Sequence, residues 1–303
     1  MSLGSVAIVG TRAEALAFAE RLAGSDAFDG ITVYGREVET PAHTVFARGL
    51  ARYVYGLEPF EATTFAVLLA VPDESVPETA FSVAGQGRAP EGCAAFHVSP
   101  TLPTDALAPL HAQGYALGAF QAFGGSGSGY VAVTGSPSAI SVARRMADAL
   151  DVEVLEVPAG RRPLVDAAST LVSGSVEPLL ALSVRLMERA GITADDARPA
   201  LLASVRSALT ALEGGRGVDA AAHPARQGDF ERAALHLRAL DPEDQRLYAF
   251  LAAELLRLDA GSADEEARGA LDRLFRRYLD EIPASPDPDS IIPDRDPQPT
   301  NVG

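Results

Sequence analysis

The first half of the chain alternates short apolar runs with amphipathic helical stretches. Strands are predicted at 6–9, 31–34, 65–71, 94–98, 115–120, 130–133 and 152–157, and helices at 13–22, 104–112 and 137–150. Strands separated by helical stretches favour right-handed crossovers, so this half is expected to form an α/β domain with a mostly parallel sheet. The run 65–71 is apolar throughout, which is typical of a parallel strand buried on both faces, and is expected at the centre.

After Pro158 the strand-like runs end and helical periodicity continues alone. The apolar stripes are Leu179, Leu182 and Leu186, then Leu201, Val205, Leu209 and Leu212, then Leu247, Leu251, Leu255 and Leu258. Glycines punctuate these stripes at positions where helices commonly stop. We therefore expect an α/β domain over 1–159 and an all-α domain over 160–282. The segment 283–303 is rich in proline and aspartate and predicts a disordered acidic tail.

Composition excludes several classes of protein. A net charge of −16 and a pI near 4.7 disfavour binding to nucleic acid and to anionic membrane surfaces. No uninterrupted apolar run has the roughly 18 residues of a membrane span, and the N-terminus lacks the pattern of a signal peptide. Cys93 has no second cysteine to pair with, and the five histidines are scattered, so no metal site is expected. These features favour a cytoplasmic protein with a small-molecule ligand.

The chain contains no lysine, and its one asparagine is Asn301. Arginine stays protonated and cannot replace lysine in proton transfer or in a Schiff base. Lysine-dependent chemistry, including pyridoxal phosphate anchoring and the lysine of phosphate-loop enzymes, is therefore excluded.

The turn after the first strand is the candidate phosphate site. In an α/β sheet, a strand that leads directly into a helix presents free backbone amides and the positive end of the helix dipole to a ligand. The dinucleotide fingerprint G-x-G-x-x-G is reduced here to Gly10, with Arg12 and Ala15 at the second and third glycine positions. Two interpretations stay open: Gly10, Thr11 and Arg12 hold a pyrophosphate, or the turn keeps only its shape.

The second strand ends at Tyr34-Gly35-Arg36, which offers no carboxylate for the ribose hydroxyls of NAD. Arg36 can instead pair with the 2′-phosphate of NADP, so NADP is the predicted cofactor. An exposed surface arginine is the alternative.

The ends of the next two strands supply further candidates. Val71 and Pro72 close the central strand and are expected to line the cofactor crevice, and Asp73 or Ser75 is expected to cap the helix that follows. His97 ends the following strand, and an imidazole at that edge is a candidate proton donor to a carbonyl group. A structural histidine is the alternative interpretation.

Five short motifs, taken in order, resemble those of a bacterial family of Rossmann-like proteins. The motifs are Val6–Thr11, Leu68–Asp73, His97–Ser99, Leu107–Leu110 followed by Gly114, and Pro224–Asp229 followed by His236-Leu237. The family carries a C-terminal helical domain of unknown function (2520) and is similar to ketopantoate reductase and pyrroline-5-carboxylate reductase. The resemblance implies a Rossmann-like NAD(P)-binding-type domain followed by a helical domain that forms a homodimer.

The sequence departs from the family pattern around the expected site. Besides Arg12 and Ala15, the departures are Gln121-Ala122, Val165-Asp166, Ser173-Gly174 and Gln227. The remaining candidates for a proton donor are His97, Asp166 and Tyr34. Two functions are therefore considered: an NADP-binding oxidoreductase acting on a small carbonyl or imine, and a catalytically inactive dimeric scaffold or small-molecule sensor.

Overall fold

The computed structural model describes residues 2–123, 129–215, 223–258 and 264–279. The chain divides into two compact units, Met1–Leu179 and Leu180–Gly303. The tail expected over 283–303 lies outside the described residues. The boundary expected near residue 160 falls between the last described strand and the long helix that begins at Arg162, and it stays a prediction.

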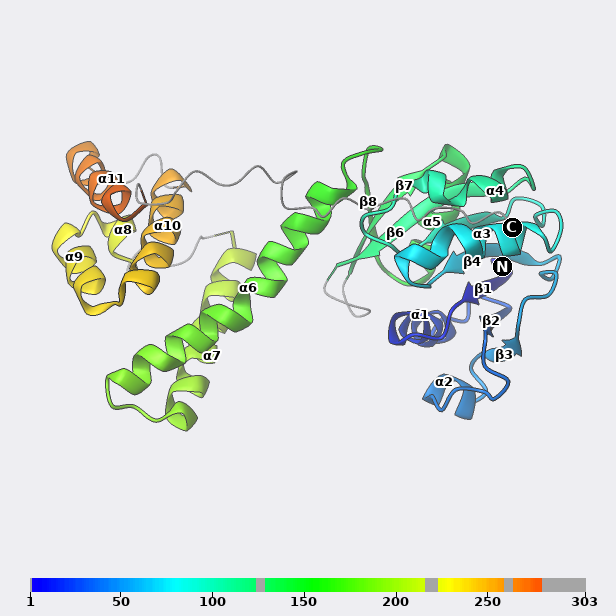
Figure 1. Ribbon diagram of the computed structural model, residues 1–303, viewed down its shortest axis with the longest axis horizontal. Coiled ribbons are helices and arrows are strands. Elements are labelled where there is room, and N and C mark those ends of the chain that lie inside the picture. The colour runs from blue at the N-terminus through cyan, green and yellow to red at the C-terminus, as the bar shows by residue number, and fades with distance from the viewer. Residues whose placement is uncertain (1, 124–128, 216–222, 259–263, 280–303) are drawn as a thin grey trace, which may run out of the picture. The chain divides into compact units, whose positions relative to one another are not determined.

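The first unit is built on an eight-stranded sheet (Figure 1). The strands are β1 (Ser5–Val9), β2 (Gly30–Gly35), β3 (Arg52–Tyr55), β4 (Thr64–Leu69), β5 (Ala94–His97), β6 (Ala116–Ala122), β7 (Tyr130–Gly135) and β8 (Glu153–Glu156). Their spatial order is β3-β2-β1-β4-β5-β6-β7-β8. The apolar strand β4 is buried along its whole length near the middle of this order, as its sequence predicts.

All neighbouring strands pair in parallel except β6 and β7. The connection between Ala122 and Tyr130 is shorter than the dozen or so residues that a parallel crossover requires, so these two strands run antiparallel. The prediction of a mostly parallel sheet is confirmed.

Helices cover both faces of the sheet. Helices α1 (Ala13–Ala23), α2 (Thr44–Ala47) and α5 (Pro137–Ala149) pack on one face, in a core that includes Ile8, Leu68 and Phe96. Helices α3 (Val76–Ala84) and α4 (Ala108–His111) cover the other face, where Val67, Leu69 and Ala95 are buried. Alternate residues of one strand thus enter opposite cores, because successive side chains point to opposite faces. Because β1 to β6 run parallel to one another, their carboxyl ends lie along one edge of this three-layer unit.

The sequence analysis missed or misjudged several short elements. Strand β3 and helix α2 were not expected, because each has four residues and β3 is an edge strand with only partly buried side chains. The helix predicted over 104–112 is instead a 3₁₀ turn, Thr104–Leu107, followed by α4.

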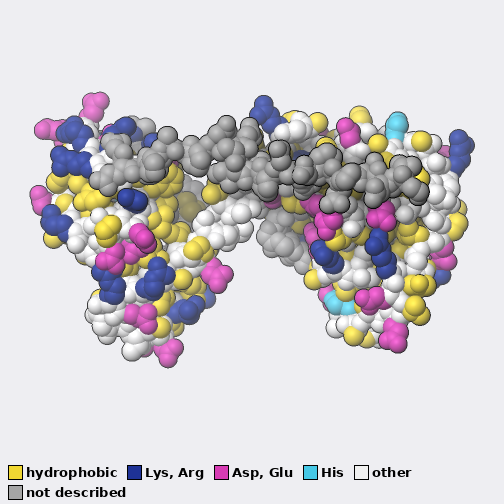
Figure 2. All heavy atoms as spheres, viewed as in Figure 1, with side chains coloured by type: hydrophobic (Ala, Val, Ile, Leu, Met, Phe, Trp, Pro, Cys, Tyr) yellow, Lys and Arg dark blue, Asp and Glu magenta, His cyan; other side chains and the backbone are white. Residues whose placement is uncertain are grey.

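The second unit is helical, as predicted. Its helices are α7 (Ala194–Glu213), α8 (Pro224–Gln227), α9 (Phe230–Ala239), α10 (Pro242–Leu258) and α11 (Glu265–Leu279). Thr193 caps α7 by accepting the backbone N–H of Asp196 at 3.3 Å. A core around Leu237, Leu271 and Phe275 joins α8 to α11. On the face shown in Figure 2, acidic and basic side chains are interspersed over both units.

Helix α6 (Arg162–Arg189) runs from the first unit into the second. Among the described residues it alone is long and apolar enough, by length and composition, to cross a membrane, although no uninterrupted apolar run marks it in the sequence. Its side chains Leu164, Leu171 and Val172 are 62%, 69% and 75% exposed in the single chain. The homodimer expected through the helical domain stays a prediction.

Candidate functional site

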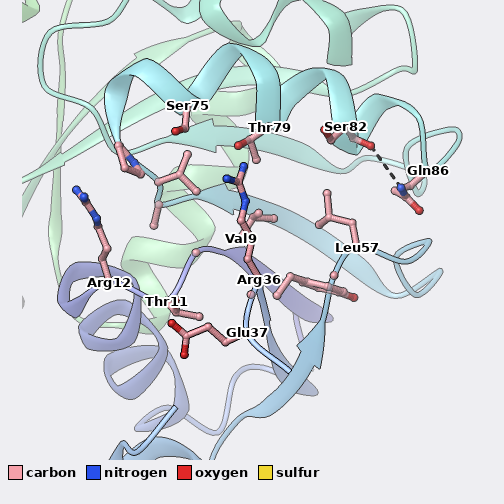
Figure 3. A pocket seen from close by; sticks show the side chains of 17 residues that line it. Val9, Thr11, Arg12, Arg36, Glu37, Leu57, Ser75, Thr79, Ser82 and Gln86 are labelled. Atoms are coloured by element: carbon pink, nitrogen blue, oxygen red, sulfur yellow. Dashed lines mark hydrogen bonds between the residues drawn. The ribbon is translucent and has the colours of Figure 1, made fainter. Parts of the chain in front are cut away.

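A pocket of about 540 Å³ opens at the carboxyl ends of β1, β2 and β4 (Figure 3). Its volume lies in the range of small-molecule and cofactor sites. One wall is formed by the turns after β1 and β2, and the opposite wall by α3 and the segment that leads into it. The lining residues from the sequence prediction are Gly10, Thr11, Arg12, Arg36, Val71 and Pro72. The structure therefore brings all six predicted cofactor-binding residues to one pocket.

Gly10 forms the close turn between β1 and α1. Its φ is +130°, and a Cβ at this position would lie 2.1 Å from the backbone oxygen of Ala70. Only glycine fits, because the obstructing atom belongs to the backbone at the end of β4. Ala15, at the third glycine position, is fully buried, so its small side chain allows α1 to pack against the sheet.

Arg12 and Arg36 stand on the same wall of the pocket and extend toward α3 (Figure 3). Arg12 is the N-cap residue of α1, and its side chain does not cap the helix. Neither guanidinium makes an ion pair or a hydrogen bond with any described residue. Arg12 lines the open pocket together with Gly10 and Thr11. Two unpaired cations along one pocket favour an anionic ligand with more than one charged group.

Two carboxylates, those of Glu14 and Asp73, interact near the amino end of α1. Burial and the neighbouring charge of Asp73 raise the pKa of Glu14 above its usual value. Negative charge at this position opposes the binding of a pyrophosphate. Arg12 and the first-turn amides of α1 provide the opposing positive potential.

The sequence analysis missed several residues of the pocket. Glu37 lines it next to Arg36 and turns to the opposite side, toward Thr11 (Figure 3). The sequence analysis expected no carboxylate at the end of this strand, and Glu37 places one there. Glu37 directly follows Arg36 in the sequence, so it could have been recognised as a further residue of this strand end.

The α3 wall is polar, which the sequence analysis also missed. Ser75, Thr79, Ser82 and Gln86 line the pocket at helical spacing. Thr79 is 4% exposed, and its Oγ1 has no hydrogen-bond partner among the described residues. Such an orphaned hydroxyl in a pocket wall is suited to a polar ligand. The spacing i, i+4, i+7 and i+11 was visible in the sequence but was not tested for a polar face.

The expectation that Asp73 or Ser75 caps α3 was wrong. Ser75 occupies the N-cap position without a side-chain hydrogen bond. Asp73 instead accepts the hydroxyls of Ser99 at 2.7 Å and Thr101 at 3.0 Å through the same carboxylate oxygen. Asp73 thus connects the segment after β5 to the end of β4. Its carboxylate accepts two charge-assisted hydrogen bonds from these hydroxyls instead of capping the helix.

Of the three candidate proton donors, His97 and Asp166 lie outside the pocket lining. His97 is fully buried at the end of β5, and its Nε2 lies 3.2 Å from the backbone oxygen of Pro103. Asp166, in the first turns of α6, accepts a hydrogen bond of 2.9 Å from Gln121 Nε2. The third candidate, Tyr34, lines the pocket and packs edge-on against Phe60, with 5.3 Å between ring centroids. Their catalytic roles stay predictions.

Because His97 is buried, we expect the free energy of unfolding to decrease when the pH is lowered. Burial, together with the charge of Arg162, lowers the pKa of His97 to about 4. The unfolded chain binds this proton near pH 6.5, so it takes up more protons than the folded chain between about pH 6.5 and pH 4, and stability falls with pH across that window. One pKa unit corresponds to about 1.4 kcal/mol, so we expect a loss of about 3 kcal/mol from this group.

Urea unfolding at a series of pH values measures this effect. His97→Gln removes the titrating group and is expected to flatten the dependence between pH 6.5 and pH 4. His111→Gln, on the exposed end of α4, is the matched control and should keep the wild-type slope. Equal slopes for His97→Gln and the wild type would contradict the assignment.

The sheet order around β1 and the pocket across its carboxyl edge define a Rossmann-like nucleotide-binding type of fold. Residues 129–255 match the family model of a domain of unknown function, DUF2520. The match begins at β7 and extends into α10, and it confirms the resemblance stated from the sequence motifs. Among curated proteins, no sequence matches this chain significantly.

Solved structures with the same fold include three that are informative. A candidate NADP oxidoreductase from Bacteroides fragilis aligns with a TM-score of 0.61 at 19% identity, covering 83% of this chain and 96% of its own. The pyrroline-5-carboxylate reductase of Coxiella burnetii aligns with a TM-score of 0.58 at 13% identity, covering 92% and 98%.

A reductive aminase from Aspergillus terreus, in complex with NADPH and ethyl-5-oxohexanoate, aligns with a TM-score of 0.54 at 15% identity, covering 92% and 95%. The chain therefore has the fold of NADP-dependent oxidoreductases. Identities this low establish the fold alone.

Proposed function

We propose that this protein binds NADP(H) in the pocket beside Gly10 and reduces a small carbonyl or imine substrate. The observation that carries the proposal is a pocket of about 540 Å³ at the phosphate-binding edge of the sheet, with the unpaired Arg12 and Arg36 in its wall. A dinucleotide carries a pyrophosphate and, in NADP, a 2′-phosphate, so two cations in one pocket wall support this ligand.

The residues present fit the cofactor. The turn at Gly10 lets a ligand approach the first-turn amides of α1, and the guanidinium of Arg12 is available to a pyrophosphate oxygen. Arg36 is available to the 2′-phosphate, while Glu37 offers an acceptor to ribose hydroxyls. Thr79 Oγ1 gains a partner from a polar ligand group on the opposite wall.

The order of the sheet supports a substrate site beside the cofactor pocket. Bound NADPH supplies a hydride, and the reduction also consumes a proton. The carboxyl ends of β4, β5 and β6 lie along the edge next to the phosphate-binding turn, and they carry the polar groups around His97 and Asp166. We propose these two residues as the candidate proton donors. The pKa of His97 lies near 4, so the ring is neutral at pH 7, and its single N–H faces the backbone oxygen of Pro103. As a proton donor, His97 would first have to exchange that contact for the substrate.

Titration of the full-length protein with NADPH and NADH, followed by calorimetry, tests the proposal. We expect NADPH to bind in the micromolar range and more tightly than NADH. Arg36→Ala is expected to weaken NADPH binding by about tenfold or more, because it removes a charge-assisted pair to the 2′-phosphate, and to leave NADH binding nearly unchanged.

Arg48→Ala, which replaces an exposed arginine at the end of α2, is the matched control and should bind NADPH like the wild type. Absence of NADPH binding at millimolar concentrations would refute the proposal and leave the inactive scaffold or sensor as the better description.

A further inference from the structure

The loop that follows β2 carries two opposite charges on consecutive residues at the edge of the pocket. Arg36 extends toward α3, whereas Glu37 turns to the other side, toward Thr11 (Figure 3). Neither of the two forms an ion pair within the part of the chain that the structure describes. A guanidinium and a carboxylate this close in the sequence attract each other, so contacts that fix the backbone between them decide whether the two charges stay apart.

Tyr53 supplies a contact of this kind. It lies on the edge strand β3, and its hydroxyl donates a hydrogen bond of 2.6 Å to the backbone oxygen of Glu37. Its ring packs edge-on against Phe46 of α2, with 5.6 Å between the ring centroids. The aromatic contact limits the positions that the ring can take, so the hydroxyl is directed at the carbonyl group of Glu37. The loop after β2 is thus held by a side chain that is itself packed against a further element.

The glycine that ends β2 makes room for this tyrosine. A Cβ at Gly35 would lie 2.5 Å from Tyr53 Oη and 2.7 Å from Thr11 Cγ2. Tyr53 therefore reaches across the backbone of β2 to the place where that strand meets the turn after β1. The end of β3 is connected to the same place, because the Gly56 N–H donates to the backbone oxygen of Gly35 at 2.7 Å. The edge strand is thus in a position to control the loop that carries the two charges.

We propose that Tyr53 is a positioning residue that sets the preference of the pocket for NADP(H) over NAD(H). By holding the backbone of Glu37, Tyr53 keeps the carboxylate on the Thr11 side and leaves the Arg36 guanidinium available to a 2′-phosphate. Without this hydrogen bond, the carboxylate can turn toward Arg36, pair with it and repel the phosphate. The inference rests on the proposed function, because it assigns to a residue outside the pocket lining a role in choosing the cofactor of that pocket.

The effect of Tyr53 is expected to depend on the 2′-phosphate. NADH lacks this group, so a carboxylate that turns toward Arg36 takes no phosphate contact away from NADH. A general loosening of the pocket would instead weaken the binding of both cofactors to the same extent. The ratio of the NADPH and NADH affinities therefore separates a positioning role of Tyr53 from a merely structural one.

Calorimetric titration of the full-length Tyr53→Phe variant with NADPH and with NADH tests the inference. Phenylalanine keeps the ring that packs on Phe46 and removes only the hydroxyl. We expect NADPH binding to weaken about fivefold, the size of one ordinary hydrogen bond, and NADH binding to stay within about twofold of the wild-type value. Tyr55→Phe is the matched control on the same strand. It removes a hydroxyl from a side chain that is 60% exposed and should keep the wild-type preference.

A second variant tests the part that the charge of Glu37 plays. Glu37→Gln keeps the backbone oxygen that accepts from Tyr53 but removes the carboxylate. In this background Tyr53→Phe should change the ratio of the two affinities by less than about twofold, because a neutral amide does not repel a 2′-phosphate. The effects of the two substitutions on the ratio are therefore expected to be non-additive. Circular dichroism and thermal melting establish the fold of each variant.

Three results in the single variants would overturn the inference: an unchanged ratio in folded Tyr53→Phe, an equal weakening of both cofactors, or the same shift in Tyr55→Phe. An undiminished effect of Tyr53→Phe in the Glu37→Gln background would overturn it as well. In each of these cases the wild type still binds NADPH, so the proposed function stands and the inference alone fails. Absence of NADPH binding to the wild type is the distinct result that overturns the proposed function, and the inference with it.

Discussion

Gly10→Ala is expected to destabilise the protein by about 4 kcal/mol, from backbone strain at positive φ together with overpacking. A Cβ at this position meets the Ala70 backbone oxygen at 2.1 Å and its carbon at 2.8 Å. The Gly10 N–H also donates to the backbone oxygen of Tyr34 at 2.9 Å, so the turn is fixed to β2 as well as to β4. Relief of the clash requires the strand ends to separate. Chemical denaturation measures the loss, and NADPH titration should show that the remaining folded protein no longer binds the cofactor.

Gly49→Ala is the matched control for this prediction. Gly49 also has a positive φ, +67°, but a Cβ there has nothing within 4 Å. Its substitution carries only the conformational strain, about 1 kcal/mol. If both variants unfold at the same denaturant concentration, the turn at Gly10 is not closed against β4 as the structure describes.

Phe96→Ala is expected to cost about 4 kcal/mol, because it removes a large buried ring and leaves a cavity. Phe96 is fully buried on β5 and stacks on Phe120, with 4.2 Å between ring centroids. The stack fits because position 118 is glycine: a Cβ there would lie 2.5 Å from the Phe96 ring. Thermal and urea unfolding give the loss in stability.

A double-mutant cycle with Gly118→Ala tests the packing directly. Gly118→Ala alone clashes with the Phe96 ring, whereas in the Phe96→Ala background the added methyl group occupies part of the cavity. The two effects should therefore be non-additive, with the double variant more stable than the sum predicts. Phe81→Ala, which replaces an exposed side chain on α3, is the control and should change stability by less than about 0.5 kcal/mol. A similar cost for Phe96→Ala and Phe81→Ala would contradict the described core.

The alternation of apolar runs and helical stretches was sufficient for the class of fold. It located seven of the eight strands, and six of these bury a continuous or alternating apolar set that local sequence records. It also located the turn between β1 and α1, where a glycine separates a buried strand from a helix. The edge strands β3 and β8 bury no residue fully: β8 was found from its valine and leucine positions, whereas the four residues of β3, Arg52–Tyr55, were missed.

The sequence also identified the wall formed by the turns after β1 and β2, and Val71 and Pro72 at the start of the opposite wall. The part of the opposite wall that α3 forms was not identified. Thr79 and its neighbours on α3 face the pocket only because α3 packs across the sheet, and their polar character is unremarkable for a surface helix.

The sequence by itself determined the α/β and helical halves, the exclusion of lysine chemistry and the position of the turn at Gly10, because these depend on composition and local periodicity. Only the tertiary structure decided that Arg162 inserts between Ser99 and Phe120, that Asp73 binds two hydroxyls instead of capping a helix, and that His97 is buried and neutral. Those facts depend on contacts between residues more than 20 positions apart and on the loss of solvent around them, which no local pattern of side chains records.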